Sequence, residues 1–225
     1  MIRITSLCNA GFAMEYEGQI LLIDITNKPY GPYYGLPEET WIQIYKKAKP
    51  YDCVCGMYFT HDHPDHCNKE MLQQYAARWP EVPIFVPEEN MTTGTIRYAP
   101  FELEYQIFPH APMLHAVPPH VVTWLRVGEK SVYLAADAAL DVQQHRVFLR
   151  GRKADLAIWN AMYLSRPETR QLLRETADRN IICHMPKERN DWAGIWKKCD
   201  NNFRRYGEEL KDVTVLEGYP NEIWL

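Results

Sequence analysis

The stretch from Met57 to His66, MYFTHDHPDH, constrains this chain more than any other part of its sequence. An apolar run ends at Thr60, and three histidines and two aspartates crowd into the next six positions. Successive side chains of an extended segment point to opposite faces, so His61 and His63 share one face. Pro64 keeps the residue before it extended and cannot continue a strand ladder. The chain therefore turns there and directs the last aspartate and histidine of the motif toward a second point nearby.

Imidazole and carboxylate groups that converge on two adjacent points suit two divalent metal ions. A single His-Asp pair would more often be a polar surface loop, or a helix cap made by Asp65. The H-x-H-x-D-H spacing directly after an apolar strand is much more specific. We therefore predict a metal centre to which Asp65 and His66 contribute alongside the first two histidines.

Short strands and helices alternate along the chain. Strands are predicted over residues 2–7, 12–16, 20–25, 53–59, 82–87, 154–160, 180–185 and 212–217, with further short strands over 91–109 and a hairpin over 120–137. Helices are predicted over residues 38–48, 68–79, 141–151, 166–179 and 192–207. Two sheets covered by helices would satisfy this order. No linker, repeat or low-complexity segment interrupts it, so we expect residues 1–225 to form one domain.

The composition narrows the class of protein. A hydrophobic fraction of 46% in 225 residues allows a sizeable core. The net charge of -4 lacks the basic surplus that a general nucleic-acid binder carries. No apolar run reaches the roughly 18 residues of a membrane span, and the N-terminus lacks the pattern of a signal peptide. The six cysteines form no C-x-x-C pair. We expect a cytoplasmic protein with reduced thiols that binds neither nucleic acid nor membranes.

The histidine motif resembles the signature of the metallo-β-lactamase superfamily. In that family a lone histidine, a lone aspartate and another lone histidine follow the motif, each at a strand end. His115, Asp137 and His184 stand in this order, and Asp24, which ends the run ILLID, matches an earlier aspartate of the family. The resemblance covers the chain from about residue 5 to residue 190. It implies a mixed α/β (α+β) fold, a four-layer αββα sandwich.

The resemblance also implies a role for each matching residue. The first metal ion would be held by His61, His63 and His115, the second by Asp65, His66 and His184, and Asp137 would bridge the two. Asp24 would orient the cluster from behind by hydrogen bonds. Two divalent ions are expected, with zinc ahead of manganese or iron.

Some positions leave alternatives open. Ala136 stands before the bridging aspartate, where the family usually has glycine. His110 and His120 bracket His115, so His110 is an alternative third histidine, whereas His120 begins a predicted strand and is expected to be structural. His145, in a predicted helix, is expected at the surface.

The charges of such a centre favour hydrolysis. Two divalent ions and the carboxylates of Asp65 and Asp137 leave a net charge of +2, and a bridging hydroxide lowers it to +1. Zinc brings the pKa of bound water to about 7, which provides a nucleophile at neutral pH. We expect a hydrolase of a small-molecule ester, lactone or phosphodiester. The resemblance implies that Asp65 can handle a proton for the leaving group as well as bind the second metal ion. The alternatives are a di-iron oxidoreductase, a phosphodiesterase or nuclease, and a non-catalytic metal-binding scaffold.

Cues to the substrate are fewer. The segment NAGFAMEYEGQILLIDI resembles the branch of the superfamily that contains ascorbate-6-phosphate lactonase-like hydrolases and also phosphodiesterases. After His184, the residues Lys187, Arg189 and Asn190 could grip an anionic substrate. The alternative is a solvated loop in which Asn190 or Asp191 caps the next helix.

Three side chains near the motifs have two interpretations each. Tyr33 belongs to a tyrosine-rich loop that covers the site or packs on the sandwich. Cys67 and Cys183 adjoin predicted ligands, so either thiolate could itself bind a metal ion. Strand alternation instead directs Cys183 into the core. The sequence leaves the oligomeric state open.

Overall fold

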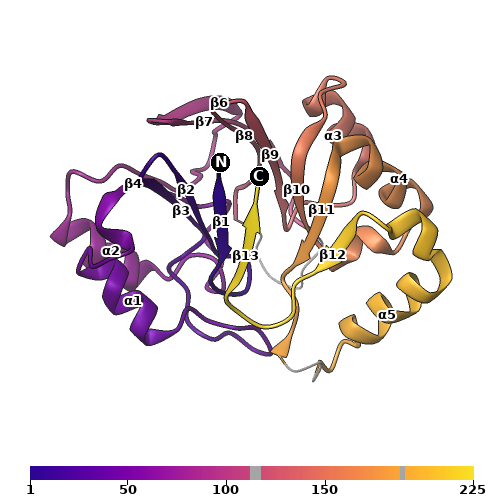
Figure 1. Cartoon of the computed structure of the whole chain (residues 1–225), viewed down its shortest axis with the longest axis horizontal. Helices are drawn as coiled ribbons and strands as arrows, with labels where there is room; N and C mark the ends of the chain where they lie inside the picture. The colour runs from indigo at the N-terminus through magenta and orange to yellow at the C-terminus, as the bar shows by residue number, and fades with distance from the viewer. Residues whose placement is uncertain (112–117, 188–190) are drawn as a thin grey trace.

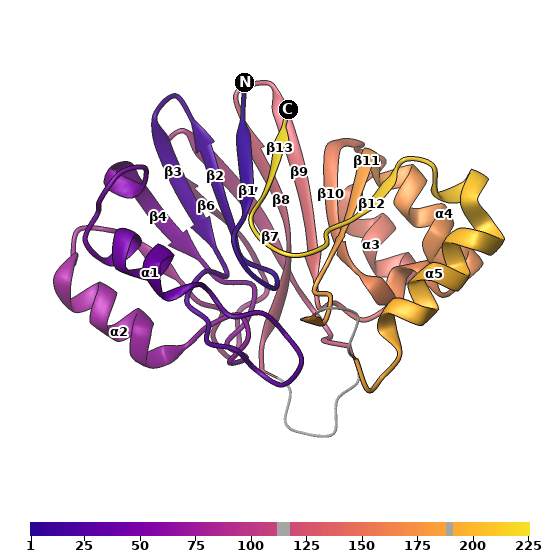
Figure 2. The ribbon, with the colours of Figure 1, turned by 60° about the horizontal axis from the view of Figure 1, so that its bottom comes forward.

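Two β-sheets stack face to face and helices cover their outer faces, as Figure 1 shows for a computed structural model that describes residues 1–111, 118–187 and 191–225. The strand order is β13-β1-β2-β3-β4-β5 in the first sheet and β12-β11-β10-β9-β8-β7-β6 in the second. Helices α1 and α2 lie on the first sheet, and α3, α4 and α5 lie on the second (Figures 1 and 2). The predicted four-layer αββα sandwich is confirmed.

The first sheet combines four antiparallel strands, β13-β1-β2-β3, with a parallel half that β3 shares. Its strands are β1 (Arg3–Ser6), β2 (Phe12–Tyr16), β3 (Gln19–Ile23), β4 (Val54–Tyr58), β5 (Ile84–Phe85) and β13 (Asn221–Trp224). Its helices are α1 (Glu38–Tyr45) and α2 (Lys69–Arg78). Helix α2 begins after Asn68, whose side chain accepts a hydrogen bond from the backbone N–H of Met71. Strands β3, β4 and β5 are parallel, so their carboxyl ends lie along one edge.

The second sheet is an antiparallel meander followed by parallel strands. Its strands are β6 (Thr93–Tyr98), β7 (Phe101–Phe108), β8 (His120–Val127), β9 (Lys130–Ala136), β10 (Ala154–Asn160), β11 (Ala177–Cys183) and β12 (Val213–Val215). Its helices are α3 (Val142–Leu149), α4 (Pro167–Thr176) and α5 (Ile195–Tyr206). Short 3-10 turns are η1 (Tyr51–Cys53), η2 (Ala161–Leu164) and η4 (Gly207–Leu210). Strands β9 to β12 run parallel, so β9 and β11 also end on a common edge.

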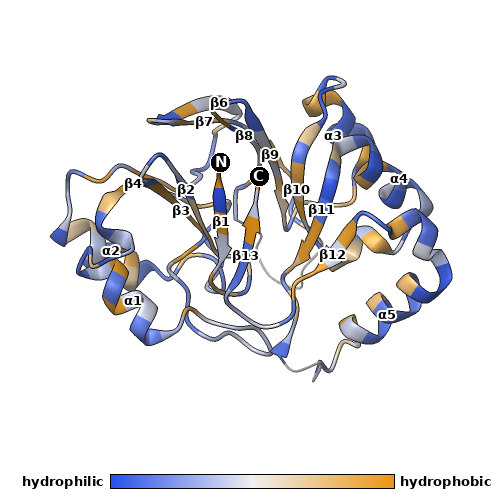
Figure 3. Cartoon of the chain, in the orientation of Figure 1, coloured by the Kyte–Doolittle hydropathy of each residue, from blue (hydrophilic) through white to orange (hydrophobic). Residues whose placement is uncertain are grey.

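Apolar side chains fill the three spaces between the four layers. The inner faces of both sheets share one buried cluster, which includes Phe12, Met14, Leu125, Leu134 and Ile158. The strands carry much of the hydrophobic sequence, whereas the covering helices carry both hydrophilic and hydrophobic residues (Figure 3). Burial of one large apolar side chain contributes about 1.5–3 kcal/mol, so these clusters hold the layers together. No described helix is long and apolar enough to cross a membrane.

Two details differ from the prediction. The helix predicted over residues 166–179 ends at Thr176, and β11 begins at Ala177, because pairing with Ala154 of β10 overrides local helix preference. The short strand β13 was not predicted, since it is defined by pairing with β1 and not by its own pattern. The assignment of residues 1–225 to one domain stays a prediction.

Candidate metal centre

The histidine motif forms a tight turn at the carboxyl end of β4. The carbonyl of His63 accepts hydrogen bonds from the backbone N–H groups of His66, at 2.9 Å, and Cys67, at 2.7 Å. The ring centroids of His61 and His63 lie 4.7 Å apart, and those of His61 and His66 lie 4.0 Å apart. The turn that Pro64 predicts thus brings the three imidazoles of the motif together.

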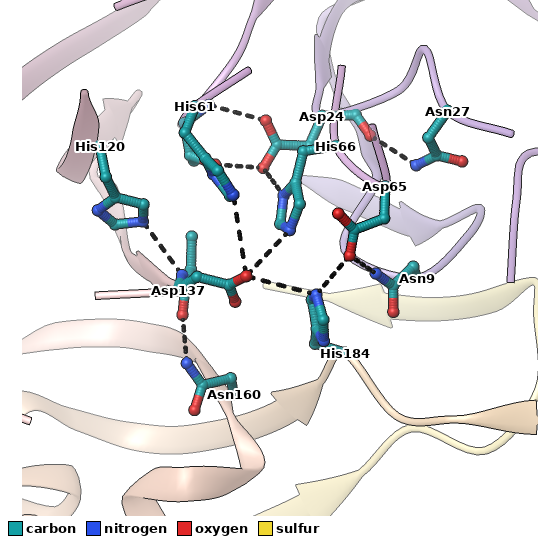
Figure 4. A network of polar contacts seen from close by, with 12 residues as sticks. Asn9, Asp24, Asn27, His61, Asp65, His66, His120, Asp137, Asn160 and His184 are labelled. Atoms are coloured by element: carbon teal, nitrogen blue, oxygen red, sulfur yellow. Dashed lines mark hydrogen bonds and ion pairs between the residues drawn. The ribbon is translucent and has the colours of Figure 1, made fainter. Parts of the chain in front are cut away.

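Residues from distant segments converge on this turn. There are three groups of residues whose possible ligand atoms, within each group, all lie within 4.8 Å of one another. They are His61, His63 and His110; His61, His66 and Asp137; and Asp65, His66 and His184. Asp137 follows β9 and His184 follows β11, at the edge where these strands end. Figure 4 shows the convergence on the carboxylate of Asp137.

One oxygen of Asp137 lies among four imidazoles. Its Oδ2 is 3.3 Å from Nε2 of His66, 3.4 Å from that of His184, 3.6 Å from that of His110 and 3.8 Å from that of His61. Burial alone would raise the pKa of Asp137, but His184 and His66 lower it well below its usual range. The carboxylate is therefore ionised and central to the cluster.

Asp24 lies behind the histidines and fixes their orientation. Its Oδ1 accepts a hydrogen bond from the backbone N–H of Thr60 at 2.8 Å, and its Oδ2 accepts from the Thr60 hydroxyl at 2.6 Å and from Nδ1 of His66 at 2.9 Å. The same hydroxyl oxygen accepts from Nδ1 of His61 at 3.0 Å. Because both Nδ1 atoms donate, both Nε2 atoms face the centre as the ligand atoms.

The ring of His110 is oriented in the same way, with Nδ1 hydrogen-bonded and Nε2 facing the centre. Its Nδ1 donates to the carbonyl of Ala111 at 2.7 Å, which leaves Nε2 toward Asp137. Within the described part of the chain, the buried Nε2 atoms of His61, His66 and His110 have no hydrogen-bond partner. Buried nitrogens without partners are costly, and a divalent cation would satisfy all three. The residues present therefore fit a metal centre.

Burial and the carboxylates set the protonation of these histidines. Burial lowers the pKa of His61 well below its usual value, so its ring is neutral. Burial also lowers the pKa of His66, but Asp137 and Asp24 outweigh it and raise that pKa well above its usual value. The carboxylates of Asp137 and Asp24 thus attract positive charge to the cluster, in the form of protons or metal ions.

A cavity opens from this cluster to solvent, with a volume of about 360 Å³. Its lining comprises Tyr30, Tyr33, His63, Pro64, Asp65, His110, Ala111, Asp137, Asn160, Ala161, Met162, His184 and Ile195. The ring of Tyr33 lies edge-on against that of His184, with centroids 4.3 Å apart. Burial, Asp137 and Asp65 raise the pKa of Tyr33 to about 12, so its hydroxyl stays protonated.

Solved structures with the same architecture identify the fold. YhfI from Bacillus subtilis, a metallo-β-lactamase fold protein, superposes with a TM-score of 0.66 at 14% sequence identity, covering 99% of this chain and 100% of its own. The chain has the metallo-β-lactamase fold. A possible metal-dependent hydrolase from Veillonella parvula gives a TM-score of 0.65 at 14% identity, with both chains fully covered.

A longer solved structure is also similar over the whole of this chain. A mutant of CmlA β-hydroxylase gives a TM-score of 0.70 at 14% identity over 100% of this chain. This chain spans only 54% of CmlA, a diiron β-hydroxylase from Streptomyces venezuelae. No protein-family model and no curated protein matches the sequence. At these identities the likeness establishes the metallo-β-lactamase fold alone, and the ascorbate-6-phosphate lactonase-like branch stays a prediction.

The structure brings together the predicted residues that it describes. His61, His63, Asp65, His66, Asp137 and His184 all lie in the cluster, with Asp24 behind it. His115 lies outside the described residues, and the alternative third histidine, His110, lies beside His61 and His63. His120 begins β8 as predicted, and its Nε2 accepts a hydrogen bond from the backbone N–H of Asp137 at 3.1 Å.

The prediction that His145 lies at the surface is wrong. Its side chain is buried beneath α3, where it interacts with the hydroxyls of Tyr133 and Tyr163. The Tyr163 hydroxyl reaches the carbonyls of Ala138 and Ala139, just after the central aspartate. Helical position was predicted correctly, but the apolar face of α3 includes this histidine.

Ala136 adopts the backbone conformation that glycine favours. Its φ is +45°, in the left-handed region, although it carries a Cβ. Asn160 at the end of β10 donates from Nδ2 to the carbonyl of Ala136 at 2.8 Å. The departure from the usual glycine of the metallo-β-lactamase fold is thus accommodated by a neighbouring strand.

The predicted substrate-binding residues have different outcomes. Tyr33 lines the cavity, whereas Lys187 does not, and its Nζ lies 5.7 Å from the ring centroid of Tyr34. Arg189 and Asn190 lie outside the described residues. Asp191 accepts hydrogen bonds from the first two N–H groups of α5, which is the capping alternative.

Both cysteines that adjoin predicted ligands lie in the apolar core. Cys183 packs with the cluster between the sheets, as predicted, and Cys67 packs with the cluster beneath α1 and α2. Burial raises the pKa of the Cys67 thiol to about 12. The two thiols are therefore protonated and apolar in character.

Sequence reasoning missed Asn9, which lies in the turn between β1 and β2. It is fully buried, donates from Nδ2 to Oδ2 of Asp65 at 3.3 Å, and accepts the backbone N–H of His184 on its carbonyl at 3.0 Å. A signal was present two residues later, because a Cβ on Gly11 would lie 2.7 Å from the carbonyl oxygen of Asp24. This glycine marks a turn that must approach the centre closely.

Proposed function

We propose that this protein is a metal-dependent hydrolase of a small-molecule ester, lactone or phosphodiester. The observation that carries the proposal is the approach of four histidine Nε2 atoms to one ionised oxygen of Asp137, at 3.3 to 3.8 Å. Neutral imidazoles and carboxylates are the donor set that zinc takes in hydrolytic sites. The similarity to a possible metal-dependent hydrolase supports the same reaction class.

The ligands divide into two sets that share Asp137. His61, His63 and His110 would hold one divalent ion, and Asp65, His66 and His184 would hold the other. Asp137 lies close enough to both sets to bridge them. This assignment gives the position of the third histidine to His110. We expect zinc, with manganese or iron as alternatives.

The residues of the chain orient the reaction. When bound, a pair of zinc ions acidifies a water molecule to a pKa of about 7 and polarises the oxygen of the scissile bond. Asp65, held by Asn9 at 3.3 Å, lies at the cavity wall and would pass the proton of the attacking water to the leaving oxygen. Tyr33 presents a protonated hydroxyl at the same wall as a hydrogen-bond donor to substrate.

A second candidate is a di-iron oxidoreductase that uses the same ligands. The similarity to CmlA, a diiron β-hydroxylase, favours it. Imidazole and carboxylate ligands suit iron as well as zinc. Elemental analysis of the purified protein distinguishes the two functions, because an oxidoreductase requires a nearly complete pair of irons.

The experiment compares two aspartates of one motif. Asp65→Asn removes a proposed ligand, whereas Asp62→Asn changes a residue whose carboxylate pairs with Lys69 at 2.7 Å. We expect Asp65→Asn to bind about one zinc fewer and to lose hydrolysis of p-nitrophenyl acetate, and Asp62→Asn to keep both. Two tightly bound zinc ions in Asp65→Asn would reject the ligand assignment. A full pair of irons without hydrolysis would favour the oxidoreductase.

A further inference from the structure

The cavity wall beyond the proposed ligands is almost entirely apolar. We call this surface the apolar wall; its members are Tyr30, Tyr33, Pro64, Ala111, Ala161, Met162 and Ile195. They come from the loop after β3, the histidine motif, the start of the loop after β7, the turn η2 and the first residue of α5. Five segments therefore contribute apolar surface to one cavity of about 360 Å³.

Apart from the proposed ligands and the tyrosines, the lining has one described polar side chain, Asn160, and its amide is already hydrogen-bonded. Oδ1 of Asn160 accepts a hydrogen bond from the backbone N–H of Met162 at 3.0 Å, and its Nδ2 donates to the carbonyl of Ala136 at 2.8 Å. No lysine or arginine of residues 1–111, 118–187 and 191–225 lines the cavity. Apart from bound metal ions, the described wall thus offers a substrate two free polar groups, the hydroxyls of Tyr30 and Tyr33.

Apolar side chains also remain exposed at the mouth. Tyr30 is 50% exposed and Met162 is 42% exposed, although both line the cavity. Large exposed apolar side chains that gather around one opening mark a place where an apolar ligand gains by leaving water. The mouth therefore extends the apolar wall toward solvent.

We propose that the substrate is a neutral ester or lactone with an apolar acyl chain that lies along the apolar wall. The inference rests on the hydrolase function proposed above. Water adds through its oxygen to the carbonyl carbon, the bond between that carbon and the alkoxy oxygen breaks, and one proton of the water passes to the leaving oxygen. An ester gives a carboxylic acid, which ionises, and an alcohol, whereas a lactone gives one hydroxy acid that carries both groups.

This chemistry agrees with the absence of lysine and arginine from the part of the wall that the structure describes. A phosphodiester or an acyl chain with a terminal carboxylate would place a negative charge against apolar side chains, which is costly without a partner. A neutral chain gains free energy for each methylene that leaves water. Transfer data convert this gain to about a fourfold increase in kcat/KM per methylene, for as long as the cavity accommodates the chain.

The test uses the full chain loaded with zinc and a graded series of esters. The probes are p-nitrophenyl acetate, butyrate and hexanoate, the monoester of adipic acid with p-nitrophenol, and bis(p-nitrophenyl) phosphate. The adipate monoester has the same scissile bond as the hexanoate and a carboxylate at the end of its chain. We expect kcat/KM to rise about fourfold per methylene from acetate to hexanoate, and to fall at least tenfold from hexanoate to the adipate monoester.

Variants assign the effect to the apolar wall. Met162→Gln introduces polar atoms at similar volume, and Ile195→Thr introduces a hydroxyl in a side chain that is one heavy atom shorter. We expect each to flatten the dependence on chain length. Val147→Thr makes the same kind of exchange at an apolar side chain of α3 that is 59% exposed and outside the cavity lining. The control should keep the wild-type profile.

The outcomes separate the inference from the proposed function. Hydrolysis that ignores chain length, or that favours the adipate monoester or the phosphodiester, would overturn the inference while leaving the hydrolase intact. If zinc- and manganese-loaded protein hydrolyses none of the probes, the proposed function fails. Binding of ketones to metal-free protein, measured by saturation-transfer NMR, then decides the inference about the cavity. It stands if 2-octanone binds more tightly than 2-butanone and Ile195→Thr removes the difference, and it fails if the two bind equally.

Discussion

Replacement of Asp24 by asparagine tests whether the carboxylate behind the centre sets metal affinity. Asp24 is buried and accepts three hydrogen bonds, two from Thr60 at 2.8 and 2.6 Å and one from Nδ1 of His66 at 2.9 Å. Asparagine keeps the shape but turns one acceptor oxygen into a donor NH₂ group. In either amide orientation at least one donor then faces another donor, and the negative charge is lost.

The size of the effect follows from these contacts. A hydrogen bond to a charged acceptor contributes about 1.5–3 kcal/mol, so the metal-free variant should lose about 2 kcal/mol of unfolding free energy. Loss of the group that orients a ligating histidine lowers metal affinity by about 10- to 100-fold, or about 1.4–2.7 kcal/mol. Urea unfolding measures the first quantity, and zinc titration against a chelator of known affinity measures the second.

The matched control is Asp155→Asn. Asp155 likewise accepts a hydrogen bond from a backbone N–H, that of Ser131 at 2.9 Å, and another from the Ser131 hydroxyl at 3.3 Å, but at the opposite end of β9. This variant should lose stability and keep zinc affinity. Our reasoning is refuted if Asp24→Asn binds both zinc ions as tightly as the wild type, or if Asp155→Asn weakens zinc binding equally.

Three further predictions concern pH, orientation and packing. Burial lowers the pKa of His145 to about 4, against 6.5 unfolded, so its contribution to stability is complete above pH 6.5 and is lost as the pH falls toward 4. Between pH 7.5 and pH 5 the wild type should lose about 2 kcal/mol more than His145→Gln in urea unfolding at fixed zinc; parallel curves would contradict this. Asn9→Ala removes the 3.3 Å hydrogen bond to Asp65 and should lower kcat about tenfold at saturating zinc with unchanged zinc stoichiometry, whereas loss of zinc would point to a different role. Gly56→Ala would push a Cβ into the buried ring of Tyr98 and should cost about 1–3 kcal/mol in thermal unfolding. Gly207→Ala should not, because its Cβ would meet no other atom within 4 Å.

The order of the strands and most members of the histidine-aspartate cluster could be predicted because both depend on local patterns. An apolar run that stops at a histidine or aspartate identifies a strand end, and parallel strands bring such ends to one edge of a sheet. Asp24, Asp137 and His184 each follow a run of this kind, and each lies in the centre or directly behind it. The motif itself needs no long-range information, since its turn closes within five residues.

The third histidine was harder to predict because it stands in a long connection between β7 and β8. Sequence distance from Asp137 favours His115, which lies outside the described residues, so that choice stays a prediction. His110 is held near the cluster by a bridge to Ala138, an interaction between segments that no local pattern encodes. The same reason hides Asn9 and Asn160, whose partners are carbonyl and carboxylate groups of other segments.

The burial of His145 could have been predicted. Within α3 the buried residues are His145, Phe148 and Leu149, at the spacing of one helical face. A histidine on that face must bury its ring with the apolar side chains. The ring nitrogens then need partners, and the hydroxyls of Tyr133 and Tyr163 supply them.

Backbone conformation shows how firmly the centre is held. Three non-glycine residues there have φ in the left-handed region: Asp24 at +50°, Ala136 at +45° and His184 at +61°. Such conformations cost of order 1–3 kcal/mol each and persist only where the surroundings enforce them. Each stands one residue past, or at, the end of a central strand, where the chain must turn sharply to direct a side chain inward. Hydrogen bonds from Asp24 N–H to Tyr58, from Asn160 to Ala136 and from His184 N–H to Asn9 secure the three turns. The positions of these three residues are therefore set by the fold of the chain itself.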